Sequence, residues 1–274
     1  MAPRLSVIGT GYLGATHAAC MAELGFEVIG VDVDPAKVEL LRSGRVPFYE
    51  PGLDEVLARN IEAGRLTFTT SFEEAGAFAD VHFICVGTPQ QAGSHAADMT
   101  QVFGSIAALT PHLKSGDLVV GKSTVPVGTA DTIAVTLASV EGVEVAWNPE
   151  FLREGFAVED TLHPDRLVVG VRSDRSEQIL REVYAPLLAE GIPFLVTDFP
   201  TAELVKVAAN SFLATKISFI NAMAEVCEAA GADVTKLAEA IGYDPRIGNR
   251  FLAAGLGFGG GCLPKDIRAF MARA

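Results

Sequence analysis

One cysteine, Cys262, has a sequence context suited to nucleophilic chemistry. It lies in G-F-G-G-G-C-L-P-K-D, between a glycine-rich loop over 255–261 and a predicted helix that Pro264 opens. A helix N-terminus and the adjacent Lys265 both favour a thiolate, so we expect the pKa of this thiol to be lowered. The other cysteines stand in apolar contexts and are expected to be small buried hydrophobes, namely Cys20, Cys85 and Cys227.

A glycine motif near the N-terminus predicts a dinucleotide site. The segment 9–14, G-T-G-Y-L-G, follows a short apolar run and opens a predicted helix, and Asp32 comes 18 residues after Gly14. Such glycines let the backbone approach a pyrophosphate, and the aspartate accepts from the ribose hydroxyls. Asp32 and Asp34 would repel a 2′-phosphate, which favours NAD over NADP. The predicted contacts are Gly9, Gly11, Tyr12, Leu13, Gly14 and Asp32.

Three further turns each follow a predicted strand. They are V-G-T-P at 86–89, S-T-V-P-V-G at 123–128 and N-P-E-F-L-R-E at 148–154. Ligands of open α/β sheets bind beyond the carboxyl ends of the strands. We therefore expect these turns to line one crevice together with the glycine motif.

The elements that must position these residues alternate along the first two-thirds of the chain. Short β-branched runs separated by helix-length segments predict an α/β fold, a doubly wound parallel sheet with helices on both faces. The predicted strands are Leu5–Ile8, Val28–Asp32, Val81–Val86, Leu118–Lys122, Val143–Trp147, Arg166–Val171 and Phe194–Thr197.

After Pro200 the pattern becomes helical. Ala202–Ala230 contains neither proline nor glycine, and Thr201 is the expected N-cap, so one long helix is predicted. Because it is apolar on almost every face between Leu204 and Val226, we expect it to be buried, and to form a homodimer over 201–230. A shorter helix is predicted at Val234–Ile241. The predicted domains are 1–198, a Rossmann-like domain, and 199–274, an all-α dimerisation domain.

Composition excludes several classes. The 274 residues include 34 acids and 21 bases, a net charge of −13, which argues against nucleic-acid binding. No apolar run is long enough to span a bilayer and no signal peptide is evident, so no membrane association and a cytoplasmic location are expected. The four cysteines lack paired spacing, which predicts neither a disulfide framework nor a metal site.

Six segments together resemble one enzyme family. These are G-T-G-Y-L-G, P-F-Y-E-P-G-L at 47–53, V-G-T-P, S-T-V-P-V-G-T, N-P-E-F-L-R-E-G and G-F-G-G-G-C-L-P-K-D. In this order they resemble the UDP-glucose 6-dehydrogenase family, which includes GDP-mannose and UDP-N-acetylmannosamine dehydrogenases. The resemblance implies NAD as cofactor, a nucleotide-sugar substrate, UDP-glucose by the wording of the motifs, and oxidation of an alcohol to a carboxylate through a cysteine thioester. Members of the family continue into a further domain that binds the nucleotide, so this chain is expected to be truncated.

The resemblance also implies roles for individual residues. Cys262 matches the nucleophile, and Lys206 and Asn210, which are four apart on one helix face, match residues that stabilise an oxyanion. Thr124 and Asp266 match the residues that hold a water, and Glu154, with its neighbour Glu150, matches the residue that activates the hydrolytic water.

Binding residues follow from the same resemblance. Gly261 departs from the family, which usually has a residue with a side chain there. Arg246 matches an arginine that reaches across a dimer interface. The positions that match NAD contacts are Asp32, Lys37, Thr88, Thr124, Glu154 and Lys265. The positions that match substrate contacts are Phe151, Leu152, Arg153, Glu154, Lys206, Asn210, Arg246, Phe251, Leu252, Ala253, Ala254, Gly255 and Gly259.

Other readings of the sequence stay open. A β-hydroxyacid dehydrogenase shares a Rossmann domain followed by long helices and needs no cysteine. A GDP-mannose or UDP-N-acetylmannosamine dehydrogenase would share all the motifs, and a truncated NAD-binding or dimerisation module would bind without turnover. The five histidines fall in no motif, which disfavours a histidine base: His17, His82, His95, His112 and His163.

Overall fold

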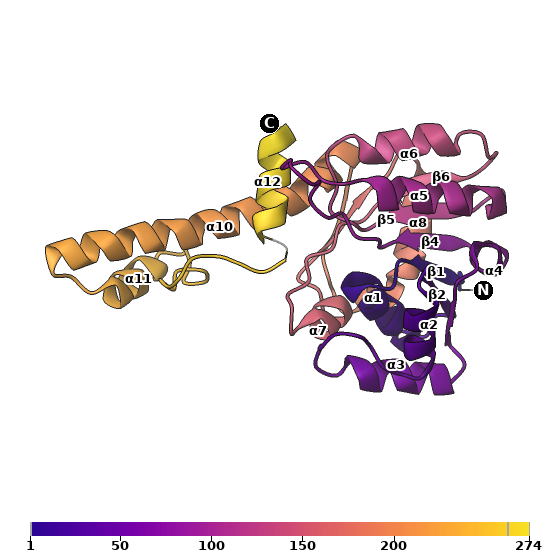
Figure 1. Cartoon of the computed structure of the whole chain (residues 1–274), viewed down its shortest axis with the longest axis horizontal. Coiled ribbons are helices and arrows are strands. Elements are labelled where there is room, and N and C mark those ends of the chain that lie inside the picture. The colour runs from indigo at the N-terminus through magenta and orange to yellow at the C-terminus, as the bar shows by residue number, and fades with distance from the viewer. Residues whose placement is uncertain (1, 262, 274) are drawn as a thin grey trace. The chain divides into compact units, whose positions relative to one another are not determined.

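The computed structural model describes residues 2–261 and 263–273, and the chain forms two compact units. The first comprises the residues up to Pro89 together with Asp98–Leu204. The second comprises Gln90–Ala97 and the residues from Val205 onward. Figure 1 shows the strands gathered in the first unit.

The first unit is built on one eight-stranded sheet in the order β3-β2-β1-β4-β5-β6-β7-β8. The strand order runs from β1 to β3 toward one edge of the sheet and from β4 to β8 toward the other, so it reverses between β1 and β4. These two strands are neighbours and parallel, with Leu5 opposite Val81. Such a reversal is where dinucleotides bind in this class of sheet. The strands are β1 Leu5–Ile8, β2 Val28–Val31, β3 Leu66–Thr69, β4 Val81–Ile84, β5 Leu118–Gly121, β6 Glu144–Trp147, β7 Leu167–Gly170 and β8 Phe194–Thr197.

Alternate residues of the strands are buried on opposite faces of the sheet. Leu5 and Val7 of β1 pack in the cluster that also holds residues of α1, α3 and α8, whereas Ser6 and Ile8 face the other side. The sheet is therefore covered on both faces, as expected. The helices of this unit are α1 Tyr12–Glu23, α2 Pro35–Arg42, α3 Leu53–Glu62, α4 Phe72–Phe78, α5 Thr100–Leu109, η1 Thr110–His112, α6 Thr129–Leu137, α7 Ala157–Leu162, α8 Asp174–Val183 and α9 Ala185–Ala189.

Two features of the sheet differ from the sequence prediction. The strand β3 was not predicted, although its alternation of apolar residues and threonines is typical of an edge strand. The sheet is also not wholly parallel, because β6 and β7 pair antiparallel through Trp147 and Gly170. A parallel neighbour requires a crossover that returns the chain across the sheet. Here the intervening chain forms a loop and α7, and α7 packs on α1.

The helices of the second unit are α10 Phe199–Ala230, which begins within the first unit, α11 Val234–Gly242 and α12 Leu263–Arg273. The predicted cap at Thr201 is wrong, since α10 begins earlier and Asp198 accepts from the Thr201 N–H at 2.7 Å. Similarly, α12 begins one residue before Pro264. No helix in the described part of the chain is long and apolar enough to cross a membrane.

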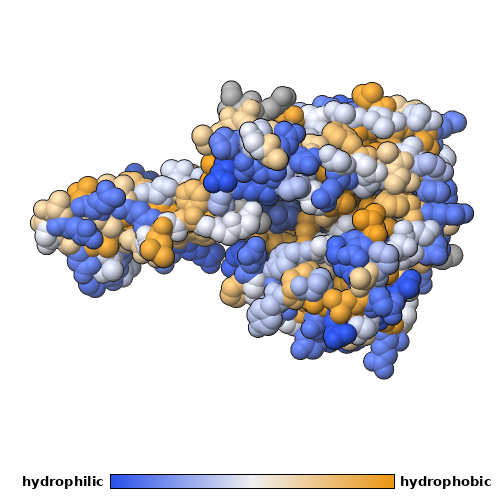
Figure 2. Space-filling model, in the orientation of Figure 1, coloured by the Kyte–Doolittle hydropathy of each residue, from blue (hydrophilic) through white to orange (hydrophobic). Residues whose placement is uncertain are grey.

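The predicted burial of α10 is not reached within the single chain, and its burial against a second subunit stays a prediction. Phe212, Phe219 and Val226 are 66%, 48% and 56% exposed, and they recur every seven residues along the helix. Figure 2 shows apolar patches between hydrophilic ones along α10 and α11. Among the described residues, α11 and the loop after it contact α10 through two hydrogen bonds: Lys216 donates to the Ile247 carbonyl at 3.0 Å, and the Gly255 N–H donates to Asn221 at 2.8 Å. The three side chains stay largely exposed beside these contacts.

Candidate functional site

The glycine motif forms a tight turn between β1 and α1. Gly9 has a φ of +88°, and a Cβ there would lie 2.6 Å from Val86 Cγ1. A Cβ on Gly14 would lie 1.8 Å from the Gly9 carbonyl oxygen, so both positions require glycine. At Gly11, in contrast, a Cβ would meet nothing within 4 Å. Gly11 is the N-cap of α1 without a side-chain cap, which leaves an open helix N-terminus suited to a pyrophosphate.

Asp32 directly follows β2 and lies beside this turn. Its Oδ2 accepts from the Thr10 N–H at 3.0 Å and from Lys37 Nζ at 2.8 Å, and its Oδ1 accepts from the Asp34 N–H at 3.1 Å. Burial opposes ionisation of Asp32, but the hydrogen bonds from Lys37 and the Asp34 N–H outweigh it, and the pKa of the carboxyl is lowered. The carboxylate is thus charged and fixed at the end of β2.

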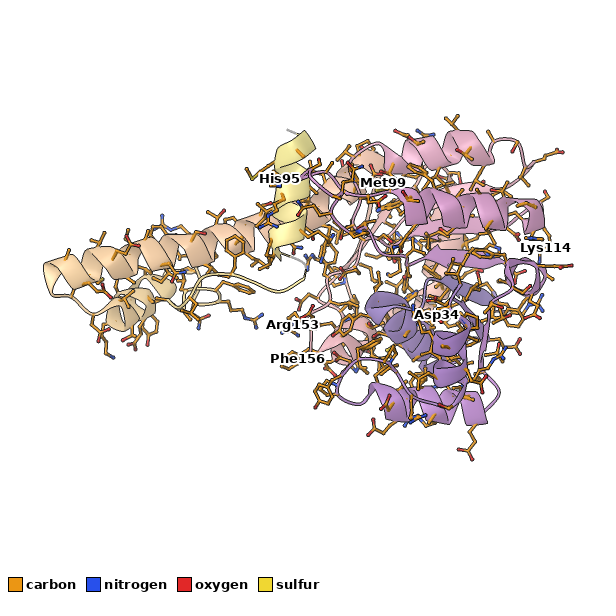
Figure 3. The ribbon with its side chains drawn as sticks, viewed as in Figure 1. Asp34, His95, Met99, Lys114, Arg153 and Phe156 are labelled. Carbon is orange, nitrogen blue, oxygen red and sulfur yellow. The ribbon has the colours of Figure 1, made fainter. Side chains whose placement is uncertain are left out.

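The residues of this corner fit NAD. Asp34 caps α2 by accepting from the Ala36 N–H at 2.9 Å, and Figure 3 shows it near the start of that helix. Two carboxylates beside the turn provide acceptors for ribose hydroxyls and an unfavourable field for a 2′-phosphate. Bound NAD would be held by the glycine turn, the N-terminus of α1 and Asp32.

The turns after β4 and β5 meet. Thr88 Oγ1 donates to the Thr124 carbonyl at 2.8 Å, and Ser123 Oγ donates to the Val86 carbonyl at 2.7 Å. Thr88 is buried and Thr124 is half-buried. The structure therefore brings two of the three predicted turns together, next to the glycine motif that Val86 contacts.

A buried lysine that sequence reasoning missed joins the third turn to them. Lys122 Nζ donates to Asn148 Oδ1 at 2.9 Å, and the Tyr184 hydroxyl donates to the same oxygen at 2.5 Å. Burial lowers the pKa of Lys122 to about 8. The signal in the sequence was a lysine closing an otherwise apolar strand, where a charge is costly.

The loop over 150–154 is held by a hydrogen bond within it and by contacts with Asp160 and Arg166. Glu150 accepts from the Leu152 N–H at 2.6 Å, and the Phe151 ring lies 3.9 Å from the Arg166 guanidinium. Arg153 donates to both oxygens of Asp160, and Figure 3 shows it beside Phe156. The guanidinium of Arg153, predicted to contact substrate, is thus paired with Asp160 of α7. The adjacent Glu154 is exposed.

A buried carboxylate that sequence reasoning also missed links α6 to the start of α10. Glu203 is 1% exposed, and its oxygens accept from the Gly128 and Ala130 N–H groups, both at 2.7 Å. Burial raises the pKa of this carboxyl. The two amides belong to the first turn of α6, directly after the turn that carries Thr124.

A buried Ser–His–Asp chain occurs in the sheet without access for a substrate. His82 lies 2.7 Å from Ser6 Oγ through Nδ1 and 3.3 Å from Asp117 Oδ2 through Nε2. Both His82 and Ser6 are 0% exposed. The chain therefore joins β1, β4 and the start of β5, and supplies no nucleophile.

In the second unit, three predicted polar residues cluster. Asn210 on α10 donates to Asp266 Oδ2 at 2.7 Å, and Lys265 donates to Asp266 Oδ1 at 2.6 Å. Asp266 is 1% exposed, and Lys206, one helical turn before Asn210, is also buried. Cys262, four residues before Asp266, lies outside the described residues.

The remaining predicted substrate residues occupy the exposed loop between α11 and α12. Arg246 pairs with Asp244, and its side chain is 87% exposed. Phe251 has a φ of +64°, a left-handed conformation that is unusual for an aromatic residue, and Leu252 is buried. Ala253, Ala254, Gly255 and Gly259 are exposed.

The fold and the glycine corner define an α/β dinucleotide-binding protein. Residues 3–188 match the NAD binding domain of the UDP-glucose/GDP-mannose dehydrogenase family, and residues 200–274 match its central domain. The chain belongs to this family.

Relatives carry a consistent name. UDP-glucose 6-dehydrogenase YwqF of Bacillus subtilis is 45% identical over 271 residues, 97% of this chain and 61% of that protein. UDP-glucose 6-dehydrogenase of Rhizobium meliloti is 44% identical over 276 residues, 99% of this chain and 63% of that protein. The chain thus spans somewhat over half the length of these relatives.

Solved structures agree with the fold. A UDP-glucose dehydrogenase from Pyrobaculum islandicum matches with a TM-score of 0.93 and 45% identity, over 99% of this chain and 63% of that one. A GDP-mannose dehydrogenase from Pseudomonas aeruginosa matches with a TM-score of 0.83 and 34% identity, over 98% of this chain and 64% of that one.

Proposed function

We propose that this chain carries the cofactor site and the reacting residues of an NAD-dependent nucleotide-sugar 6-dehydrogenase that converts UDP-glucose to UDP-glucuronate. The observation that carries the proposal is the cluster of Asn210, Lys265 and Asp266 around the buried Asp266 carboxylate. Lys265 and Asp266 come three and four residues after Cys262 in the sequence, and Asn210 is one helical turn after Lys206. A cluster of this kind is suited to holding a proton and an oxyanion beside a nucleophile.

The proposed reaction removes two hydrides in succession. NAD, when bound, accepts each hydride. In the first oxidation the C6 alcohol loses a hydride and a proton and becomes an aldehyde; the proton goes to the water that Thr124 and Asp266 hold. The Cys262 sulfur then adds to the aldehyde carbon and gives a thiohemiacetal, whose oxygen takes up the thiol proton. The second oxidation removes a hydride and a proton and leaves a thioester.

Hydrolysis completes the proposed reaction. Lys206 and Asn210 stabilise the oxyanion, and Glu154 accepts a proton from the attacking water. The C–S bond breaks, the thiol is restored and the carboxylate leaves. Two molecules of NAD are reduced for each sugar oxidised.

We also propose that two copies of the chain associate through α10. The support is the row formed by Phe212, Phe219 and Val226, whose seven-residue spacing is that of a helix–helix seam. Arg246, largely exposed and paired with nearby Asp244, would reach the other copy's substrate in such a dimer.

Replacement of the nucleophile tests the chemistry. In the Cys262→Ser variant we expect carboxylate formation to fall by at least about a thousandfold, because an oxyester forms and turns over poorly, while NADH-dependent reduction of the C6 aldehyde persists. The measurement is NADH formed per sugar over a panel of UDP-glucose, GDP-mannose and UDP-N-acetylmannosamine. Cys227→Ser, a buried cysteine on α10, is the matched control.

The outcomes separate the candidate functions. A yield near two NADH per UDP-glucose supports the proposal, and the same yield with another sugar changes only the substrate. A yield near one that Cys262→Ser leaves unchanged would indicate a β-hydroxyacid-type enzyme. NAD binding without binding of any nucleotide sugar would indicate a cofactor or dimerisation module.

A further inference from the structure

The segment P-F-Y-E-P-G-L at 47–53 has no role in the chemistry above, yet it contains a buried carboxylate. Glu50 is 5% exposed and lies just before α3. Its Oε2 accepts from the Tyr12 hydroxyl and from the Gly155 N–H at 2.9 Å, and its Oε1 accepts from the Ala157 N–H at 2.7 Å. One side chain thus joins three segments of the first unit.

The first of these segments is the glycine motif. Tyr12 is the first residue of α1, and its ring packs on Phe48 with the centroids 5.1 Å apart. Burial and the hydrogen bond to Glu50 raise the pKa of the Tyr12 hydroxyl, so it remains a protonated donor. The hydroxyl also accepts from the Gly155 N–H at 3.2 Å. The Tyr12 side chain therefore binds Glu50, and the backbone of Tyr12 is the part that could contact a dinucleotide.

The other segment carries Glu154. Gly155 directly follows it and has a φ of +84°, so the chain turns sharply at this point. Ala157 begins α7, whose N-cap Phe156 has no side-chain cap. Glu50 satisfies two amides of this turn with one carboxylate, which fixes the direction of the backbone on the C-terminal side of Glu154.

We propose that Glu50 is a positioning residue that couples the cofactor turn to the segment that presents Glu154. NAD bound at the glycine motif restrains Tyr12, Tyr12 restrains Glu50, and Glu50 restrains the backbone at Gly155. The inference rests on the proposed function, in which Glu154 activates the hydrolytic water. The coupling would hold Glu154 in place for hydrolysis while the cofactor is bound.

Hydrogen exchange on the chain, with and without NAD, tests the coupling. In the wild-type chain we expect NAD to slow exchange both in 9–15 and in 153–158. Glu50→Gln replaces one of the two acceptor oxygens with an amide NH₂ group. That group is itself a donor and would face the donors that now bind the carboxylate. We expect exchange at Gly155 and Ala157 to become about ten- to a hundredfold faster, with NAD still protecting 9–15 but no longer 153–158. Glu55→Gln, an exposed glutamate in α3, should change neither.

A second variant keeps the test decisive if Glu50→Gln fails to fold. Tyr12→Phe retains the ring on Phe48 and removes only the hydroxyl, so it should also abolish the NAD-dependent protection of 153–158, with a smaller change in exchange without NAD. Retained NAD-dependent protection of 153–158 in either folded variant would overturn the coupling and leave the proposed function standing. Failure of the wild-type chain to bind NAD would overturn both.

Discussion

At the scale of single residues, burial shifts the pKa values of Lys122 and Cys85 in opposite directions. Burial lowers the pKa of Lys122 to about 8 and raises the pKa of Cys85 to about 12. Between pH 8 and 10.5 the unfolded chain keeps the lysine proton that the folded chain has lost, so Lys122 makes folding more favourable as pH rises. In the same range the unfolded chain loses the Cys85 proton first, so Cys85 makes folding less favourable.

Substitution should therefore separate the two effects. Relative to the wild-type chain, the free energy of unfolding of Lys122→Met should fall as pH rises from 8 to 10.5, by roughly 2 to 3 kcal/mol, whereas that of Cys85→Ala should rise. Urea unfolding at a series of pH values measures both. Parallel pH profiles for all three proteins would contradict the assignment.

At the scale of elements, Glu203 is the contact that fixes the first turn of α6 to α10. Glu203→Ala removes the carboxylate that accepts from the Gly128 and Ala130 N–H groups. These two buried amides then lose that hydrogen-bond acceptor. We expect the free energy of unfolding to fall by about 1 to 3 kcal/mol. Chemical denaturation is the measurement, and Glu225→Ala, at an exposed position of the same helix, is the control. An equal fall in the free energy of unfolding of both variants would contradict the prediction, because the hydrogen bonds from Glu203 to α6 would then contribute nothing measurable.

At the scale of the whole molecule, the row on α10 predicts the oligomeric state. Replacing Phe212 and Phe219 with serine removes two large apolar side chains from the proposed seam, so the dimer should dissociate while NAD affinity stays within about twofold. Analytical ultracentrifugation measures the first and calorimetry the second. Val135→Ser, at an exposed apolar position of α6, should leave the dimer intact. A monomeric wild-type chain would refute the proposed seam.

Several parts of the fold and site follow from local sequence. The glycine turn could be predicted because Gly9 and Gly14 sit where a Cβ would collide with backbone, a constraint that only glycine satisfies. Most strand positions could be predicted because buried parallel strands require continuous apolar runs. The edge strand β3 was missed because an alternation of apolar residues and threonines over only four residues is a weak signal, although Thr67 is its one exposed residue.

What the sequence by itself determined is the presence of a dinucleotide turn and of a charge directly after β2, since each depends on residues close together along the chain. The tertiary structure alone decided that β7 runs antiparallel to β6, that Glu50 joins Tyr12 to Gly155, and that Lys122 and Glu203 are buried. These are contacts between segments far apart in sequence, and which buried charge meets which amide depends on how the strands and helices pack.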